Sequence, residues 1–213
     1  MRGEGKAAQA YHRIERMIVF QQVAPGALIS EATLMEQTGL GRTPVREALQ
    51  QLARNRMVEI YPNKGVLIPP TSVESQLRML ELRRVLEALA VGLACHRATN
   101  QDHLLMTAVV ASLTEGTFTL EEYAETVRQT HDLIATAAHN DYLTDAMAPL
   151  QGLSRRFWIS HVIDEQAEIR TGAALHTAIL RAILAGDHAQ AEAASHNLND
   201  YLVDFAHATL TRP

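Results

Sequence analysis

The chain has 213 residues, of which 47% are hydrophobic and 20% charged, the composition of an ordinary globular protein of one or two domains. No apolar run approaches the roughly 18–20 residues of a membrane-spanning helix, and the polar N-terminus carries no signal-peptide pattern. We therefore expect a cytoplasmic protein without a membrane partner. The single cysteine, Cys95, excludes an internal disulfide.

Charge is distributed unevenly along the chain. Residues 1–70 carry nine Lys and Arg against six Asp and Glu, a net charge of +3, whereas residues 71–213 carry a net charge of −8. The first segment can approach a phosphate backbone, and the second would repel one. We expect two domains with different tasks, residues 1–70 for DNA binding and residues 71–213 for effector binding and dimerisation.

Three short helices are expected in the first domain. Apolar side chains recur at helical spacing over residues 10–20, and Pro25-Gly26 then marks a turn. Ser30 can cap a second helix, which Gly39 can close. A third helix begins a few residues later, so the second and third helices form a helix-turn-helix.

The third helix has the clearest local specification. Thr43 is a suitable N-cap, and Pro44 then falls at the first helical position, where its missing N–H costs nothing. Its buried stripe is expected to consist of Val45, Ala48, Leu49 and Leu52. A helix that presents Arg, Thr and Gln from its other face suits the DNA major groove, because Arg pairs with guanine edges and a helix N-terminus holds phosphates. The side chains presented are Arg42, Thr43, Arg46 and Gln50.

A hairpin is expected after the third helix. Residues 58–60 and 66–68 alternate apolar with other residues on either side of Pro62-Asn63-Lys64-Gly65, which has the composition of a turn. A helix-turn-helix with such a hairpin is a winged helix, and its wing tip would bring Lys64 and Gly65 close to DNA. The alternative is that this segment is only a good turn.

These residues resemble the N-terminal domain of GntR-type bacterial transcription regulators. The resemblance covers residues 10–70 and rests on Pro25-Gly26, on the run from Gly39 to Leu49 with its Arg-Thr-Pro-Val-Arg-Glu-Ala-Leu core, and on Asn63-Lys64-Gly65. Gly41 departs from the family, where Ser or Thr is usual, so one phosphate contact is expected to be missing. The resemblance implies operator contacts from the recognition helix and from the wing, at Arg42, Thr43, Arg46, Lys64 and Gly65.

Residues 71–213 show helical spacing and no strand pattern. After a stiff Pro69-Pro70 break, a long helix is expected over residues 73–97. Further helices are expected at 102–113, 120–139, 141–150, 154–163, 165–185 and 187–210. The predicted fold class is therefore mainly α, an N-terminal winged helix-turn-helix with a small β-hairpin wing followed by a C-terminal bundle of six to seven helices.

The bundle resembles the effector domain of the FadR branch of the same family. The resemblance covers residues 73–208 and rests on Glu81-x-Arg83-x-x-x-Glu87, on His131, and on His176 with Gly186-Asp187 ten residues later. It implies a homodimer that binds a palindromic double-stranded operator, with repression as the commonest response. It also implies a small-molecule effector in the bundle, an organic acid or an acyl compound.

Many members of this branch hold a divalent metal with one Asp and three His. His131 and His176 match two of these ligand positions, whereas Val127 and Leu198 occupy the other two. Two imidazoles do not complete a four-ligand site. We therefore expect no cofactor; the alternative is a metal-dependent variant of the same regulator that senses a small carboxylate.

The predicted effector-binding residues are Arg83, His131 and His176. The resemblance makes Arg83 the cation that faces a carboxylate of the effector, and the alternative is an ordinary ion pair with Glu87 one turn later. The two histidines lie on apolar helix faces, where they either line a pocket or serve as core histidines. The cluster of Arg155, Arg156 and Trp158 fits either a pocket mouth or an interface.

An enzyme is the rival class of protein. No nucleophile–base pair, Gly-rich phosphate loop or carboxylate pair stands at a suggestive spacing, and Asp132 points about 100° around the helix from His131. A DNA-binding architectural protein without an effector is a third class, for which the acidic domain is larger than dimerisation requires. The sequence therefore predicts a ligand-controlled transcription regulator and no enzymatic activity.

Overall fold

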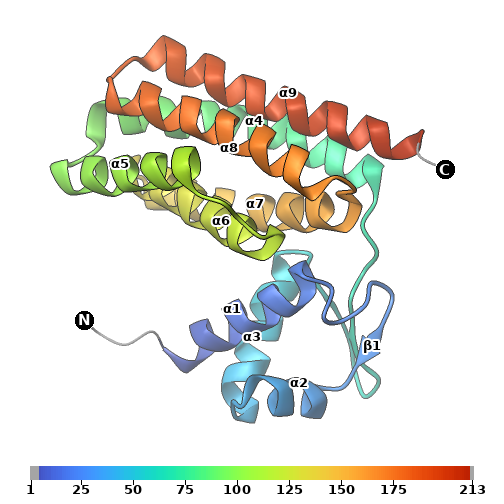
Figure 1. The fold of residues 1–213 in the computed structure, drawn as a ribbon. Coiled ribbons are helices and arrows are strands. Elements are labelled where there is room, and N and C mark those ends of the chain that lie inside the picture. The colour runs from blue at the N-terminus through green and yellow to red at the C-terminus, as the bar shows by residue number, and fades with distance from the viewer. Residues whose placement is uncertain (1–4, 212–213) are drawn as a thin grey trace. The chain divides into compact units, whose positions relative to one another are not determined.

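A computed structural model describes residues 5–211 of the chain. Over that range the chain forms nine α-helices and one three-stranded antiparallel sheet (Figure 1). The chain divides into two compact units, one made of residues up to Ser72 together with Arg155–Ser160, the other of the remaining residues from Val73 onward. The predicted fold class, mainly α with a small sheet, is confirmed. None of the helices in the described range is both long and apolar enough to cross a membrane.

The first unit contains three helices and the sheet. Helix α1 packs against α3, and α2 packs against α3 as well. The largest fully buried side chains of the unit include Ile14, Ile18, Leu34, Leu49 and Leu52, which come from all three helices. One shared apolar core therefore fixes α3 in place. The elements are α1 (Lys6–Val19), β1 (Leu28–Ile29), α2 (Glu31–Thr38), α3 (Arg42–Arg54), β2 (Glu59–Tyr61) and β3 (Gly65–Leu67).

The ends of α2 follow the prediction, and the start of α3 does not. Ser30 accepts a hydrogen bond from the Thr33 amide at 3.0 Å, and Gly39 closes α2 at a φ of +66°. Gly41, and not Thr43, is the N-cap of α3. The prediction was wrong by two residues because Pro44 is tolerated anywhere in the first turn, whose amides have no partner within the helix.

The sheet contains one strand more than predicted. The β2–β3 hairpin lies within one residue of its predicted limits and pairs Ile60 with Val66. Strand β1 pairs with the other edge of β3, with Ile29 opposite Val66, so the order is β1-β3-β2. A strand of two residues has no periodicity of its own, so it could not be predicted from the sequence pattern.

The second unit is an all-helical bundle. Helix α9 runs alongside α4 and α8, with which it makes the most extensive helix contacts of the unit (Figure 1). Capping boxes start two of the helices, Thr99 with Asp102 at α5 and Thr119 with Glu122 at α6. Its helices are α4 (Val73–Arg97), α5 (Asn100–Glu115), α6 (Leu120–Ala137), α7 (Asp141–His161), α8 (Glu165–Leu184) and α9 (His188–Leu210).

Helix α7 corrects the prediction of two helices at 141–150 and 154–163. It is continuous, with Pro149 inside it. Met147, Gln151 and Ser154 are buried on either side of the proline, and Ser154 accepts a hydrogen bond from Gln76 on α4 at 2.9 Å. Tertiary packing of the flanking turns therefore offsets the hydrogen bond that Pro149 cannot make.

The last part of α7, residues 155–160, belongs to the first unit. Within that unit Arg155 forms a buried ion pair with Glu15 at 3.2 Å, and Arg156 donates to the carbonyl of Pro69. Trp158 is buried. These contacts give the Arg155, Arg156 and Trp158 cluster a packing role.

Candidate nucleic-acid interface and bundle cavity

Helix α3 buries one face and exposes the other. Its buried residues are Val45, Ala48, Leu49 and Leu52, the stripe that the sequence predicted. The four predicted DNA-binding residues of the helix are all exposed, namely Arg42, Thr43, Arg46 and Gln50. The structure thus presents two guanidinium groups, a hydroxyl and an amide on one side of a rigidly packed helix, which are the donors that base edges and phosphates accept.

Arg46 is held by a neighbouring helix. Its Nε donates to Glu31 Oε2 at 2.7 Å, and Glu31 is the first residue of α2. A guanidinium has five N–H donors, so this bond leaves its terminal nitrogens suited to an end-on bidentate contact with guanine. No sequence spacing pointed to the pair, because the two residues lie 15 positions apart on different helices.

The wing carries the other two predicted contacts. Lys64 is exposed at the turn, after Asn63 at a φ of +61°. Gly65 has a φ of +128°, and a Cβ there would lie 2.7 Å from the backbone oxygen of Ile29. The fold itself therefore requires glycine at this position. Tyr61, which sequence reasoning missed, is also exposed on the wing and donates to Glu59 at 2.8 Å.

His131 on α6 and His176 on α8 meet inside the bundle. Both are buried, and their Nε2 atoms lie 3.2 Å apart. The Gly172 carbonyl lies 2.7 Å from His176 Nδ1 and can only accept, so Nδ1 carries a proton. Burial, helped by the nearby Arg83 and opposed by the hydrogen bond to Gly172, lowers the pKa of His176 to about 4, so the ring is neutral near pH 7. His176 Nε2 therefore accepts the proton of His131 Nε2.

Arg83 and Glu87 form a buried ion pair on α4. Arg83 donates to Glu87 Oε1 through both Nε, at 3.1 Å, and Nη2, at 2.5 Å. Their side chains are 3% and 7% exposed, so neither charge is screened by water. Arg83 is thus paired with Glu87 one turn along its own helix. This ion pair is the alternative that the sequence allowed to a contact with a carboxylate of the effector.

The donor set of the bundle does not fit a resident metal ion. Val127 and Leu198, which occupy two ligand positions of metal-binding relatives, are both buried apolar side chains. Within residues 5–211 no group of three or more His, Cys, Asp or Glu is arranged to hold a metal ion. Two imidazoles fall short of the three protein ligands of the usual zinc site. The expectation of no metal stays a prediction, now supported by this chemistry.

A small cavity lies beside His131 at the centre of the bundle. It offers about 10 Å³ to the centre of a water-sized molecule, which is room for one water. Two polar atoms of its wall, Glu87 Oε2 and Gln151 Nε2, are buried and have no hydrogen-bond partner among the described residues. The lining residues are Glu87, Val91, His131, Ile134, Met147, Gln151, Ile179, Ser195 and Leu198.

Of the predicted effector residues, only His131 lines this cavity directly. His176 does not line the cavity but is hydrogen-bonded to His131, which does. Arg83 likewise contacts the lining residue Glu87 and not the cavity itself. Gln151 was missed because it falls between the two helices that were predicted in place of α7. Only an uninterrupted helical register through Pro149 would have placed it on the same face as Met147.

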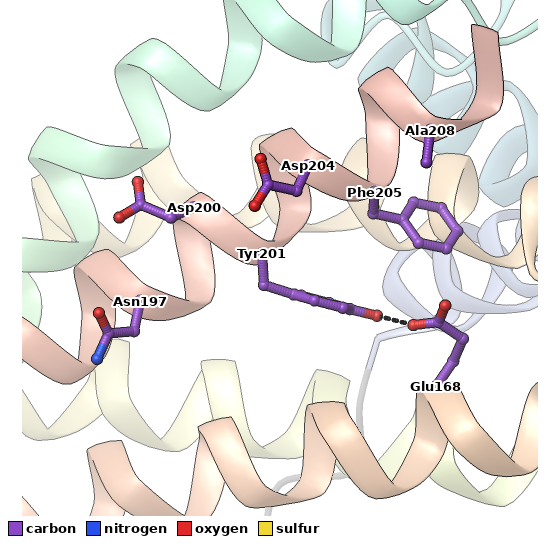
Figure 2. A pocket seen from close by; sticks show the side chains of 7 residues that line it. All are labelled: Glu168, Asn197, Asp200, Tyr201, Asp204, Phe205 and Ala208. Atoms are coloured by element: carbon purple, nitrogen blue, oxygen red, sulfur yellow. Dashed lines mark hydrogen bonds between the residues drawn. The ribbon is translucent and has the colours of Figure 1, made fainter. Parts of the chain in front are cut away.

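A second hollow lies on the outside of the bundle between α8 and α9. Figure 2 shows Tyr201 reaching across from α9 so that its hydroxyl donates to the carboxylate of Glu168 on α8. Asp200, another lining residue, accepts from Arg84. The hollow is open, and its three acidic residues, Glu168, Asp200 and Asp204, are paired or can be solvated, unlike the polar groups of the central cavity.

Comparison with known proteins gives two family matches. Residues 6–68 match the bacterial regulatory proteins of the gntR family, and residues 78–200 match the FCD domain. The Nta operon transcriptional regulator of Aminobacter aminovorans is 29% identical over 152 residues, 71% of this chain and 71% of that protein. The transcriptional repressor GlaR of Escherichia coli K12 is 24% identical over 192 residues, 85% and 86% of the two chains.

Solved structures share the fold. The E. coli protein McbR/YncC superposes with a TM-score of 0.81 at 20% identity, over 97% of this chain and 99% of that one. At this identity the likeness concerns the fold alone. It extends over both the winged helix and the helical bundle.

Proposed function

We propose that this chain, which belongs to the gntR family and carries an FCD domain, acts as a ligand-controlled repressor. Its family makes it a DNA-binding transcriptional regulator and not an enzyme. One observation carries the proposal: α3 is packed by a single face and exposes Arg42, Thr43, Arg46 and Gln50 from the other. Repression is supported by the relative GlaR, which is named a repressor.

DNA contact in this proposal is made by the first unit. Arg46 reads a guanine, Thr43 and Arg42 hold phosphates beside the start of α3, and Lys64 adds a phosphate contact from the wing. The net charge of +3 over residues 1–70 supports the same assignment, because the phosphate backbone attracts this segment and repels the acidic remainder. A protein with this task works in the cytoplasm.

The regulator acts as a homodimer on a palindromic operator, because a two-fold protein matches a two-fold site. An exposed apolar stripe on α4 supports this part of the proposal. Leu82, Val85 and Leu89 recur at helical spacing and are 51%, 66% and 49% exposed. Contiguous exposed apolar side chains on a protein surface commonly mark a protein–protein interface.

The effector site of the proposal is the central cavity of the bundle. Small-molecule sites are usually mostly apolar cavities with a few convergent polar groups, and this cavity has that lining but must widen to admit more than a water. Ligand binding would favour one dimer geometry over another and thereby change operator affinity. The organic-acid or acyl effector and the metal-dependent alternative remain predictions; for an acid, Arg83 would have to leave Glu87.

Selection of binding sites from random DNA with the full chain tests the proposal. We expect an enriched palindrome, bound by two copies of the chain in native mass spectrometry. A Leu82→Asp, Val85→Asp double variant should lose the dimer and the affinity for the palindrome, whereas Leu104→Asp on the exposed side of α5 should keep both. A random pool without enrichment would contradict the repressor, and a dimeric double variant would contradict the α4 interface.

A further inference from the structure

We infer that the bundle cavity selects a small neutral ligand with a hydroxyl or amide group, which donates to Glu87 Oε2 and accepts from Gln151 Nε2. This inference rests on the proposed effector site and names the chemical class of its ligand. The class differs from a carboxylate, the ligand for which Arg83 would be the expected partner.

The charge of the wall is the first reason. Glu87 is the charged residue that lines the cavity, and Arg83 behind it neutralises the carboxylate through two hydrogen bonds to Oε1. A carboxylate or an ammonium ion would therefore bring an uncompensated charge into a buried site, which is strongly unfavourable.

The hydrogen-bonding groups of the wall are the second reason. Glu87 Oε2 is an acceptor and Gln151 Nε2 is a donor, and neither has a partner among the residues that the structure describes. Both residues are buried, so bulk water does not satisfy these atoms. Only a group that both donates and accepts satisfies the pair at once. Alcohols and primary or secondary amides do so without a charge.

The size and the apolar lining limit the rest of the ligand. Val91, Ile134, Ile179 and Leu198 line the cavity with the polar pair, and its space in this structure admits a single water-sized group. Met147 and Gln151 lie one turn apart on α7, and the flexible Met147 side chain can move to enlarge the space. With Met147 moved, a ligand with a short aliphatic chain attached to the polar group matches this wall.

A three-carbon series tests the inference with the full chain. Propionamide, 1-propanol, propionate and propylamine share one skeleton and differ in the charge and hydrogen bonding of the terminal group. We expect calorimetric titration to give Kd values for propionamide or 1-propanol about tenfold or more below those for propionate and propylamine. Tighter binding of propionate or propylamine, or no binding of any of the four, overturns the inference.

Gln151→Met locates the binding site. It keeps the length of the side chain and removes the amide, so it should raise the unfolding midpoint of the unliganded protein, because a buried donor without a partner disappears. The same change should weaken propionamide binding about tenfold, since one hydrogen bond to the ligand is lost. Gln190→Met on the exposed surface of α9 is the matched control and should change neither quantity. Unchanged propionamide binding in Gln151→Met overturns the inference.

The outcome is separable from the test of the repressor itself. A carboxylate that binds and lowers operator affinity would overturn the ligand class and leave the effector proposal standing. Failure to enrich any DNA sequence would contradict the repressor proposal, whatever the cavity binds.

Discussion

At the scale of single residues, the contact between Arg46 and Glu31 gives a prediction with an unusual sign. Removing an acidic group near DNA ordinarily strengthens binding, because the phosphate backbone repels carboxylates. Glu31 instead fixes the guanidinium of Arg46 through a 2.7 Å hydrogen bond from Nε. Glu31→Gln is therefore expected to lower the preference for the operator over a site with altered guanines by about threefold to tenfold.

Glu36→Gln provides the control for this measurement. Glu36 is an exposed residue of the same helix, and its replacement removes the same charge. Fluorescence anisotropy with the two DNA duplexes should show slightly tighter binding of both by Glu36→Gln, with the preference retained. If Glu31→Gln behaves in the same way, Glu31 does not position Arg46.

The buried His176 makes the stability of the bundle depend on pH. Its pKa of about 4 in the folded protein lies below the ordinary value of 6.5, because burial opposes the charged form. Between these two values the unfolded chain binds a proton that the folded chain does not. Stability is therefore intact above pH 6.5 and falls as the pH drops toward 4, by at most about 3 kcal/mol.

Urea unfolding at a series of pH values, followed by the circular dichroism of the helices, checks this. His176→Gln should flatten the dependence between pH 6.5 and 4, whereas His207→Gln at an exposed position of α9 should leave it as in the wild type. An equally steep loss of stability in His176→Gln would assign the pH dependence to other groups.

At the scale of elements, α7 shows where local and tertiary signals disagree. Pro149 lies in the interior of the helix, where its ring and its missing N–H normally cost about 3 kcal/mol. Packing of Met147 and Gln151 keeps the helix continuous despite this cost. Pro149→Ala should therefore raise the free energy of unfolding by about 1–3 kcal/mol in urea titrations.

Pro25→Ala makes the same substitution outside a helix. Pro25 is exposed in the turn before β1, where proline restricts the unfolded chain, so this variant should be slightly less stable than the wild type. A loss of stability in Pro149→Ala would mean that the backbone around α7 has adapted to the proline.

The elements also show how far the sequence could be interpreted. Strong periodicity and turn composition predicted the buried face of α3, the hairpin and the start of α6, because these signals are local to each segment. The β1 strand, the continuity of α7 and the Glu31–Arg46 contact were not predictable, since each depends on residues distant in the sequence. For the same reason Gln151, on the wrongly divided helix, was absent from the predicted site.

At the scale of the whole molecule, the uneven charge along the sequence predicted two domains with different tasks, and the structure has two compact units. The residues expected at the DNA are all exposed on the first unit apart from Gly65, which is partly buried and which the fold requires for its own geometry. The residues expected at the effector lie together in the second unit. Arg83 is paired there with Glu87, one of the two arrangements that its spacing allowed, whereas the contact between His131 and His176 joins two helices and could not be assigned from spacing.

The most direct test of the central claim, that α3 reads the operator, is the ratio of the Kd for a scrambled duplex to the Kd for the selected operator. We predict that Arg46→Ala lowers this ratio about 5- to 150-fold, which corresponds to a loss of about 1–3 kcal/mol of discrimination. Arg78→Ala, which removes the same charge from an exposed pair with Glu74 on α4, should keep the ratio of the wild type. A ratio in Arg46→Ala equal to that of the wild type would contradict the claim.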